Sequence, residues 1–521
     1  MKITLLSIYP DIHSYGVRIL SSVLKKEGHS VDIIFLTNEF WQRFDEKTLD
    51  DVVKLAKGSD LIGISLMSNF WDNAIHLTNK FREHYNTPIL WGGTHPTVRP
   101  DECLKHADMV CISESEEPVV ELTRRMTKGL NYTDIKGMGF RTKEKIINNG
   151  HGPLPGSKDS MFKHLDEVPH QDYDWKNHYI LKDDKVVNID MEILNKFGDT
   201  YMTMPTRGCP FACTFCVNSE FLKMYPHQKP IRMRTVDNII DELNLVKKTM
   251  PFVKQILFND DAFFLMPVAM IKDFSKKYEE QIKMPLIITG ATPSTLSKTK
   301  LSILADAGLV GLRMGIQTLA ENSKKLYKRP HSNAAIMAAV KVINEQKERV
   351  NVNYDFILES PWDTDENTVE TLRFVAQIPP PYNLNLFRLV FFPGTDLYMR
   401  AKKEGIVKND IEDIYRRHYG DESLKRTYLT QIFYTLSDYG AFGKSIPYSL
   451  IHFITNRKKW LYPLHKLILT MLQINFRLVR RVERLKLKLS RLSTKMPKIN
   501  IAKKEAKIEE ASTDVAKWVQ N

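Results

Sequence analysis

Residues 206–216 read Thr-Arg-Gly-Cys-Pro-Phe-Ala-Cys-Thr-Phe-Cys and follow the apolar run Tyr-Met-Thr-Met at 201–204. Cys209, Cys213 and Cys216 therefore lie on a loop that leaves a predicted strand. Three thiolates can each bind one iron of a four-iron four-sulfur cubane and leave the fourth iron open to another ligand. The chain has five cysteines, an odd count that is poorly suited to a disulfide framework. The loop thus predicts an iron-sulfur cluster with an open reaction site.

Two other sites could use the same residues. A structural zinc ion normally takes four ligands, and electron-transfer clusters also use four cysteines, whereas this loop has no fourth ligand at a suitable spacing. The other two cysteines, Cys103 and Cys111, are read as packing residues. Unpaired cysteines favour a reducing compartment, and the amino terminus resembles a first strand more than a signal peptide, so a cytoplasmic protein is expected.

Strands and helices alternate on both sides of the cysteine loop. Residues 196–400 contain six strand-like apolar runs separated by helical patterns, which predict a partial (β/α)6 barrel of the TIM type with its active site at the carboxyl ends of the strands. Residues 1–150 show the same alternation and predict an α/β domain with a parallel, Rossmann-like (flavodoxin-like) sheet. Residues 151–195 are expected to connect the two domains.

The cysteine loop resembles that of the radical S-adenosylmethionine superfamily, and the order of domains resembles the members that have an amino-terminal cobalamin-binding-like domain. The resemblance implies that the cluster binds S-adenosylmethionine and cleaves it to an adenosyl radical. It places Asp260 and Asp261 of FNDDAF near the amino group of this cofactor, and Gly315 and Gln317 of MGIQT near its polar end. Glu359 stands where the family often has glycine.

The amino-terminal domain also resembles cobalamin-binding domains. His13 lies in the loop Asp-Ile-His-Ser-Tyr-Gly at 11–16, in the position of a cobalt-binding histidine, and the alternative is a loop histidine with a local hydrogen bond. Ser65, Gly92 and Gly93 match the accompanying serine and paired glycines. Ser113 and its neighbour Ser115 replace glycines that are usual in this class. Cobalamin is therefore an expected cofactor.

With both cofactors, the implied activity is methyl transfer to an unactivated carbon of a small molecule. Two alternatives stay open: a radical cyclisation, rearrangement or carbon–carbon coupling in the same fold, and a non-catalytic iron-sulfur redox scaffold. A flavodoxin or ferredoxin is the implied electron donor, and no nucleic-acid partner is expected. No general acid or base can be read from the sequence.

Residues 401–521 are expected to form a helical extension with a basic amphipathic tail. Between Arg477 and Lys498 there are nine Lys or Arg residues and a single acid, Glu483, within a helical pattern of apolar residues. Such a helix either packs on the barrel with its cations in solvent or contacts an anionic membrane surface or acidic partner. The second reading would suit a lipid or isoprenoid substrate. No apolar run is long enough to span a bilayer.

Overall fold

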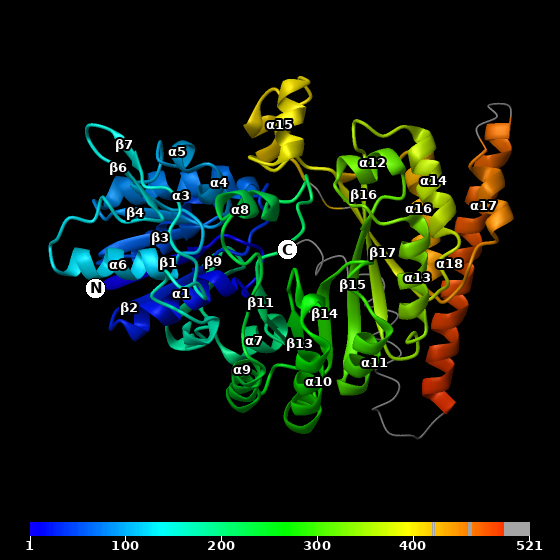
Figure 1. Cartoon of the computed structure of the whole chain (residues 1–521), viewed down its shortest axis with the longest axis horizontal. Coiled ribbons are helices and arrows are strands. Elements are labelled where there is room, and N and C mark those ends of the chain that lie inside the picture. Colours follow the sequence, from blue (N-terminus) through cyan, green and yellow to red (C-terminus); the bar gives the residue numbers. More distant parts are fainter. Residues whose placement is uncertain (419, 421–422, 457–460, 494–521) are drawn as a thin grey trace. The chain divides into compact units, whose positions relative to one another are not determined.

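The computed structural model describes residues 1–418, 420, 423–456 and 461–493, without the side chains of 479 and 482–493. Tertiary contacts divide the chain into two units (Figure 1). Unit 1 comprises Met1–Ile287 and Val390–Arg417, and unit 2 comprises Ile288–Leu389 and His418–Asn521. Each unit is described separately below.

Unit 1 begins with a nine-stranded sheet in the order β7-β6-β5-β4-β3-β1-β2-β8-β9. The strands from β5 through β8 in this order pair in parallel, and β6, β7 and β9 add antiparallel edges. Their bounds are β1 Lys2–Ser7, β2 Ser30–Phe35, β3 Leu61–Ser65, β4 Ile89–Gly92, β5 Met109–Cys111, β6 Met138–Arg141, β7 Ile146–Asn148, β8 His178–Lys182 and β9 Lys185–Asn188.

The first five strands lie in the order 2-1-3-4-5, which confirms the predicted flavodoxin-like sheet. Strand order reverses at β1, so the loops after β1 and β3 part there and leave room for a ligand. Helices α1 and α6 pack together, as do α2 and α3. The helices of this region are α1 Tyr15–Lys26, α2 Glu46–Leu55, α3 Trp71–His84, α4 Thr94–Val98, α5 Pro100–Cys103, α6 Glu116–Thr127 and α7 Met191–Phe197.

The predicted connector 151–195 does more than join two domains. It supplies β8, which pairs in parallel with β2, and β9, which pairs with β8. The first part of this segment is rich in Gly and Pro residues. The two strands are short and form a hairpin whose turn contains Asp183 and Asp184, both with positive φ. Because these strands are so short, they give little periodicity in the sequence. The sheet therefore has more strands than the sequence indicates.

The second strand series starts in unit 1. Strand β10 pairs in parallel with β13, and the short strands β11 and β12 pair with each other in the antiparallel sense. Thr235 caps α9 by accepting a hydrogen bond from the Asn238 N–H. The elements are β10 Thr200–Thr203, β11 Thr206–Arg207, α8 Asn218–Met224, β12 Arg232–Met233, α9 Val236–Thr249, β13 Gln255–Phe258, α10 Val268–Lys277 and α15 Asp396–Lys403.

Strand β14 (Leu286–Ala291) carries the chain across the boundary, and unit 2 continues the series. In unit 2, β16 pairs in parallel with both β15 and β17. Six strands therefore alternate with helices along the chain, as predicted for residues 196–400. The elements are α11 Lys298–Ala307, β15 Leu309–Gln317, α12 Glu321–Leu326, α13 Asn333–Asn344, β16 Asn351–Leu358, α14 Asp365–Val375 and β17 Asn383–Arg388.

The carboxyl-terminal extension is helical as predicted. It consists of α16 Tyr428–Ala441, α17 Tyr448–Ile454 and α18 Tyr462–Ser493. Helix α18 packs on α16 and α17 within unit 2. The rest of the predicted basic tail, residues 494–521, lies outside the described residues. Among the helices described, none combines the length and the apolar composition that crossing a bilayer requires.

Candidate functional site

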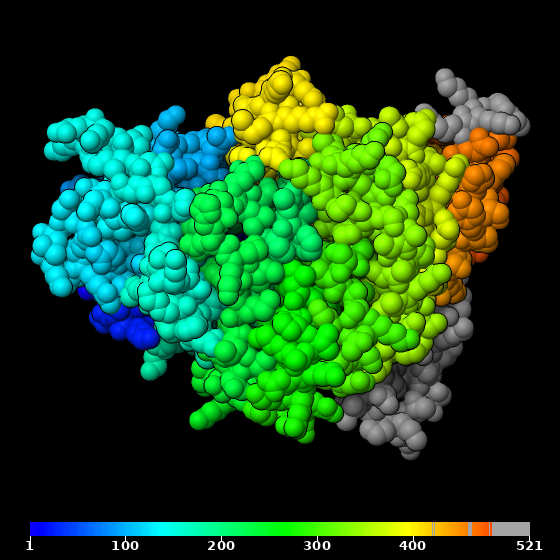
Figure 2. All heavy atoms as spheres, viewed as in Figure 1, coloured from blue at the N-terminus to red at the C-terminus, as the bar shows by residue number. Residues whose placement is uncertain are grey.

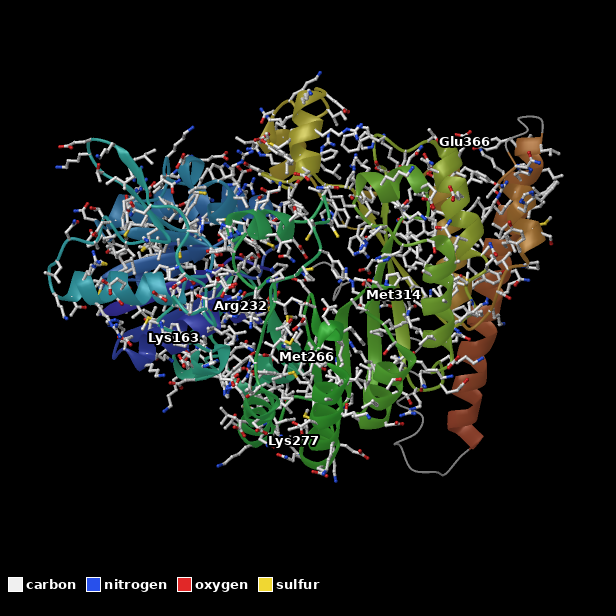
Figure 3. The ribbon with its side chains drawn as sticks, in the orientation of Figure 1. Lys163, Arg232, Met266, Lys277, Met314 and Glu366 are labelled. Carbon is white, nitrogen blue, oxygen red and sulfur yellow. The ribbon has the colours of Figure 1, made fainter. Side chains whose placement is uncertain are left out.

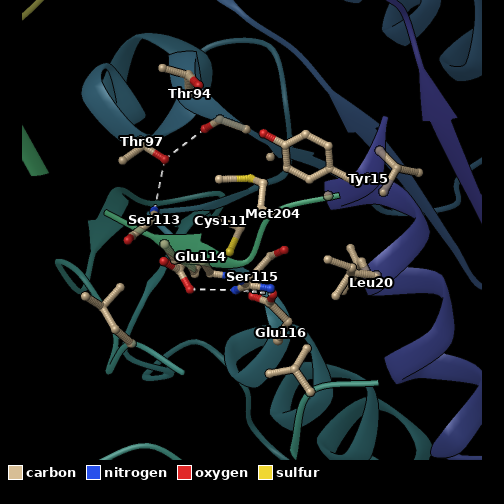
Figure 4. A pocket seen from close by; sticks show the side chains of 18 of the residues that line it. Tyr15, Leu20, Thr94, Thr97, Cys111, Ser113, Glu114, Ser115, Glu116 and Met204 are labelled. Carbon is tan, nitrogen blue, oxygen red and sulfur yellow. Dashed lines mark hydrogen bonds and ion pairs between the residues drawn. The ribbon is translucent and has the colours of Figure 1, made fainter. Parts of the chain in front are cut away.

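Unit 1 contains a cavity of about 490 Å³, a volume typical of small-molecule sites (Figure 4). One wall is formed by the carboxyl ends of the first-sheet strands β1, β3, β4 and β5. Another part of the lining comes from the second strand series and includes Arg207, Gly208, Cys209, Asn218 and Asp261. The ligand edge of the first sheet and the start of the cysteine loop therefore border the same space.

The serine and paired glycines predicted from the resemblance all line this cavity. The Ser65 hydroxyl lies 3.2 Å from the Tyr9 hydroxyl. Gly93 has φ +102°, and a Cβ there would lie 2.7 Å from the Leu66 carbonyl oxygen, so glycine is required. Gly92 is different, because a Cβ there would meet nothing nearer than the Cys111 Cβ at 4.0 Å.

His13 lies beside the cavity but is not among the residues that line it, whereas Tyr15 and Gly16 are. Its loop is held in place: the Asp11 carboxylate accepts hydrogen bonds from the His13 N–H (2.6 Å) and the Ser14 N–H (3.2 Å). The buried Arg18 guanidinium donates to the Ile12 carbonyl oxygen at 2.9 Å from Nε. Burial lowers the pKa of His13, which favours the neutral imidazole that a metal requires.

The cysteine loop follows β11 directly and ends where α8 begins. Gly208 has φ +92°, and a Cβ there would lie 2.3 Å from the Pro230 carbonyl oxygen, so only glycine fits this entry. Cys213 is buried, and Cys209 and Cys216 are half-buried. Within the described part of the chain, no three His, Cys, Asp or Glu side chains gather as around a single metal ion. A cubane has a different requirement, since each thiolate binds its own iron.

The aspartate pair separates into two roles. The Asp260 carboxylate is buried and accepts hydrogen bonds from the Thr206 N–H (2.6 Å), the Thr206 hydroxyl (2.7 Å) and the Ala262 N–H (2.7 Å). Burial raises its pKa to about 6 despite these donors. Asp261 is exposed, accepts from the Asn218 side-chain amide at 2.8 Å and lines the cavity. Asp260 thus anchors the strand that enters the cysteine loop, and Asp261 faces the ligand space.

A charge network that the sequence analysis missed crosses the cavity wall. Arg207 Nη1 lies 2.7 Å from Glu114 Oε2 and 2.7 Å from Glu116 Oε1. Arg232, labelled in Figure 3, also pairs with Glu114 and donates to the Pro155 carbonyl oxygen at 2.5 Å. Burial opposes ionisation of Glu114, but the two guanidiniums outweigh it and lower its pKa to about 2. The loop after β5 is thereby tied to the residue two positions before Cys209. The sequence run Ser-Glu-Ser-Glu-Glu at 113–117 was the available signal.

The backbone at Ser113 explains how this loop keeps its shape without glycine. Ser113 has φ +78°, the left-handed conformation that glycine adopts most easily. Its N–H donates to the Thr97 hydroxyl at 2.9 Å, and that hydroxyl donates to the Gly93 carbonyl oxygen at 2.8 Å (Figure 4). Thr97 thus joins the loops after β4 and β5 at the cavity.

Two family models match the two halves of this site. Residues 1–123 match the B12 binding domain, and residues 203–375 match the radical SAM superfamily. The chain therefore has an amino-terminal B12-binding domain followed by a radical SAM domain. The cofactors of these families are a four-iron four-sulfur cluster with S-adenosylmethionine, and cobalamin, as the sequence predicted.

Curated relatives and solved structures agree with this assignment. An uncharacterized methyltransferase, PH0819 of Pyrococcus horikoshii, is 24% identical over 393 residues, which cover 74% of this chain and 78% of the relative. Bacteriochlorophyllide d C-8(2)-methyltransferase of Chlorobaculum tepidum is 24% identical over 367 residues, covering 68% and 70%. The structure of the radical S-adenosylmethionine methyltransferase TsrM from Kitasatospora setae with cobalamin and a [4Fe-4S] cluster has a TM-score of 0.60 at 16% identity, covering 77% of this chain and 78% of that one.

Gly315 and Gln317 of this radical SAM protein lie in unit 2, at the carboxyl end of β15. The pairing of β15 with β16 shifts register between them, and Gln317 has φ +73°. The Gly315 carbonyl oxygen accepts a hydrogen bond from Arg329 Nη2 at 2.6 Å. A Cβ on Gly315 would lie 2.6 Å from the Gln317 amide nitrogen, the end of a flexible side chain that can move aside. Their predicted contact with S-adenosylmethionine stays a prediction.

Proposed function

We propose that the chain is a cobalamin-dependent radical SAM methyltransferase that methylates an unactivated carbon of a small molecule. The observation that carries this proposal is one cavity in unit 1, whose lining includes Cys209 together with Ser65, Gly92 and Gly93. Methyl transfer needs the methyl carrier and the radical source to reach one substrate, and a shared cavity would meet this need.

When bound, the cluster with S-adenosylmethionine supplies a hydrogen-abstracting radical, and cobalamin supplies the methyl group. The residues of the chain position and shield these groups. Asp260 fixes the strand that enters the cysteine loop through Thr206. The pairs of Arg207 with Glu114 and Glu116 hold that loop against the loop after β5. Buried, mutually satisfied charges of this kind favour one arrangement of the two loops, which preorganises the site.

Three finer assignments belong to this proposal. His13 is the proposed cobalt ligand, supported by its fixed loop, which leads into the cavity-lining residues Tyr15 and Gly16. A small-molecule substrate and an electron donor such as flavodoxin or ferredoxin fit the family. A lipid or isoprenoid substrate is supported by the apolar side chains that helix α18 exposes.

The experiment that tests the proposal is anaerobic turnover. The chain is reconstituted with iron, sulfide and hydroxocobalamin and mixed with dithionite and S-adenosylmethionine. Because one S-adenosylmethionine gives a methyl group and another gives the radical, both S-adenosylhomocysteine and 5′-deoxyadenosine are expected. Deoxyadenosine without S-adenosylhomocysteine, from protein that retains no cobalamin, would instead support the cyclisation or coupling alternative. If protein with a fully loaded cluster forms neither S-adenosylhomocysteine nor 5′-deoxyadenosine, the result would support the redox-scaffold alternative.

A further inference from the structure

Helix α18 has one face packed against its own unit. His465, Leu469 and Phe476 are buried, and their spacing places them on a single side of the helix. The Tyr439 hydroxyl of α16 donates to the Leu472 carbonyl oxygen at 3.0 Å, and the Gln473 amide reaches the Thr435 hydroxyl at 3.3 Å. This packing fixes which side of α18 is turned outward.

The outward side carries a stripe of five exposed apolar side chains. We call these residues the α18 stripe; their exposed fractions are Leu464 44%, Leu467 51%, Met471 57%, Ile474 49% and Leu478 57%. At 3.6 residues per turn they fall within an arc of about 80°, roughly opposite the packed face. The orange atoms of α17 and α18 are visible at the surface in Figure 2. Scattered exposed leucines are ordinary, but a continuous row marks an interaction surface.

The charge of α18 indicates what this stripe contacts. Residues 462–493 contain eight Lys or Arg residues and one acid, Glu483. Among the side chains described, Lys466, Arg477 and Arg481 are exposed and lie on the flank of the stripe. Burial raises the pKa of Asp438 of α16 to about 6, although the Arg480 and Arg477 guanidiniums oppose this rise. The helix thus presents an apolar stripe bordered by cations.

A second copy of the chain is one occupant that such a stripe could take. Its spacing of three and four residues resembles the seam of a coiled coil, in which stripes of two helices pack together. Each α18 helix has eight Lys or Arg residues and one acid, so pairing two of them would bring two strongly cationic helices together. Like charges at the edges of the seam oppose this association. An anionic lipid surface satisfies both the stripe and the cations.

We propose that α18 docks this enzyme on the surface of an anionic lipid bilayer, with the α18 stripe in the interface and the flanking cations at lipid phosphates. From Leu464 to Leu478 the stripe spans about 21 Å at 1.5 Å per residue, so the contact would run along this part of the helix. Its packed face keeps α16 and α17 on the water side. This inference is independent of the methyl-transfer proposal, because it concerns where the enzyme works and not what it catalyses.

Vesicle flotation of the cofactor-loaded full chain tests this inference. The vesicles consist of phosphatidylcholine alone or of phosphatidylcholine mixed with phosphatidylglycerol. We expect binding to the mixed vesicles that weakens with salt, and little binding to phosphatidylcholine alone. The triple variant Leu467→Glu, Met471→Glu, Ile474→Glu should reduce the partition coefficient at least about tenfold, since charges replace the inserted side chains.

The matched control is the double variant Leu130→Glu, Ile146→Glu, which makes the same change at apolar residues of unit 1 that are 55% and 43% exposed. It should bind vesicles as the unaltered chain does, and circular dichroism should show both variants folded. Equal vesicle binding by the folded stripe variant would overturn the proposal. So would a dimer in light scattering that the stripe variant converts to a monomer, with no vesicle binding, because a second copy would then cover the stripe.

Discussion

Replacing Cys209, Cys213 and Cys216 together with alanine should abolish 5′-deoxyadenosine formation and remove the cluster. Without the three thiolates no iron is held with an open position for S-adenosylmethionine, so loss of the radical is complete rather than partial. Asp260 and the pairs of Arg207 with Glu114 and Glu116 are unchanged in this variant, and the loop entry should keep its fold. The measurements are iron and sulfide content, the visible absorption of the cluster, and deoxyadenosine by chromatography.

Cys103→Ala is the matched control, since Cys103 is buried at the end of α5 and does not line the cavity. It should keep the cluster and the deoxyadenosine yield of the unaltered chain. A triple variant that still forms deoxyadenosine would contradict the assignment of these three cysteines.

Replacing Gly92 with tryptophan should prevent retention of cobalamin. Gly92 lines the cavity, and a side chain there starts without a clash, because its Cβ meets only the Cys111 Cβ at 4.0 Å. A large ring extending from this position would occupy the space that the cofactor needs. We expect cobalamin bound after gel filtration to fall at least about tenfold, which corresponds to about 1.4 kcal/mol of binding free energy. Cluster content should be unchanged, because Gly92 ends β4 and is not part of the cysteine loop.

Gly92→Ala is the control that distinguishes the effect of filling the cavity from the effect of replacing glycine in the backbone. Its methyl group fits the available space, so this variant should retain cobalamin. Equal retention of cobalamin by Gly92→Trp and the unaltered chain, with both folded, would place the cofactor elsewhere.

The sequence predicted the elements whose patterns are local. The apolar strands of residues 1–150 follow from their local pattern. Ser65, Gly92 and Gly93, which the resemblance indicated as cobalamin-binding residues, line the cavity, and their contact with cobalamin stays a prediction. Strands β8 and β9 were missed because four or five residues give too short a pattern to recognise. Their pairing with β2 joins positions that are far apart in the chain, which periodicity does not report.

Two of the departures from family glycines, at Ser113 and Glu359, keep a backbone conformation that glycine adopts easily. Ser113 and Glu359 both keep positive φ, at 78° and 56°, so each retains the turn that glycine would make. At Ser113 the turn is fixed by the hydrogen bond to Thr97. Glu359 pairs with Arg388 at 3.3 Å, and its carboxylate accepts a hydrogen bond from the Lys425 N–H at 2.5 Å. Sequence showed the substitutions but not the partners that hold these residues in the left-handed conformation.

The roles of Asp260 and Glu114 also depended on the fold. Two adjacent aspartates look equivalent in sequence, yet only Asp260 meets the backbone of Thr206, 54 positions away. Glu114 meets Arg207 across 93 positions. Such pairings arise from how the strands assemble, and a single sequence does not display them.

The most direct test of the central claim is electron paramagnetic resonance of the chain loaded with both cluster and cob(II)alamin. If both groups border one cavity, reducing the cluster should broaden the cobalt signal and speed its relaxation. The triple cysteine variant supplies the unperturbed cobalt spectrum. A cobalt signal that does not change on cluster reduction, in protein fully loaded with both groups, would contradict the shared cavity.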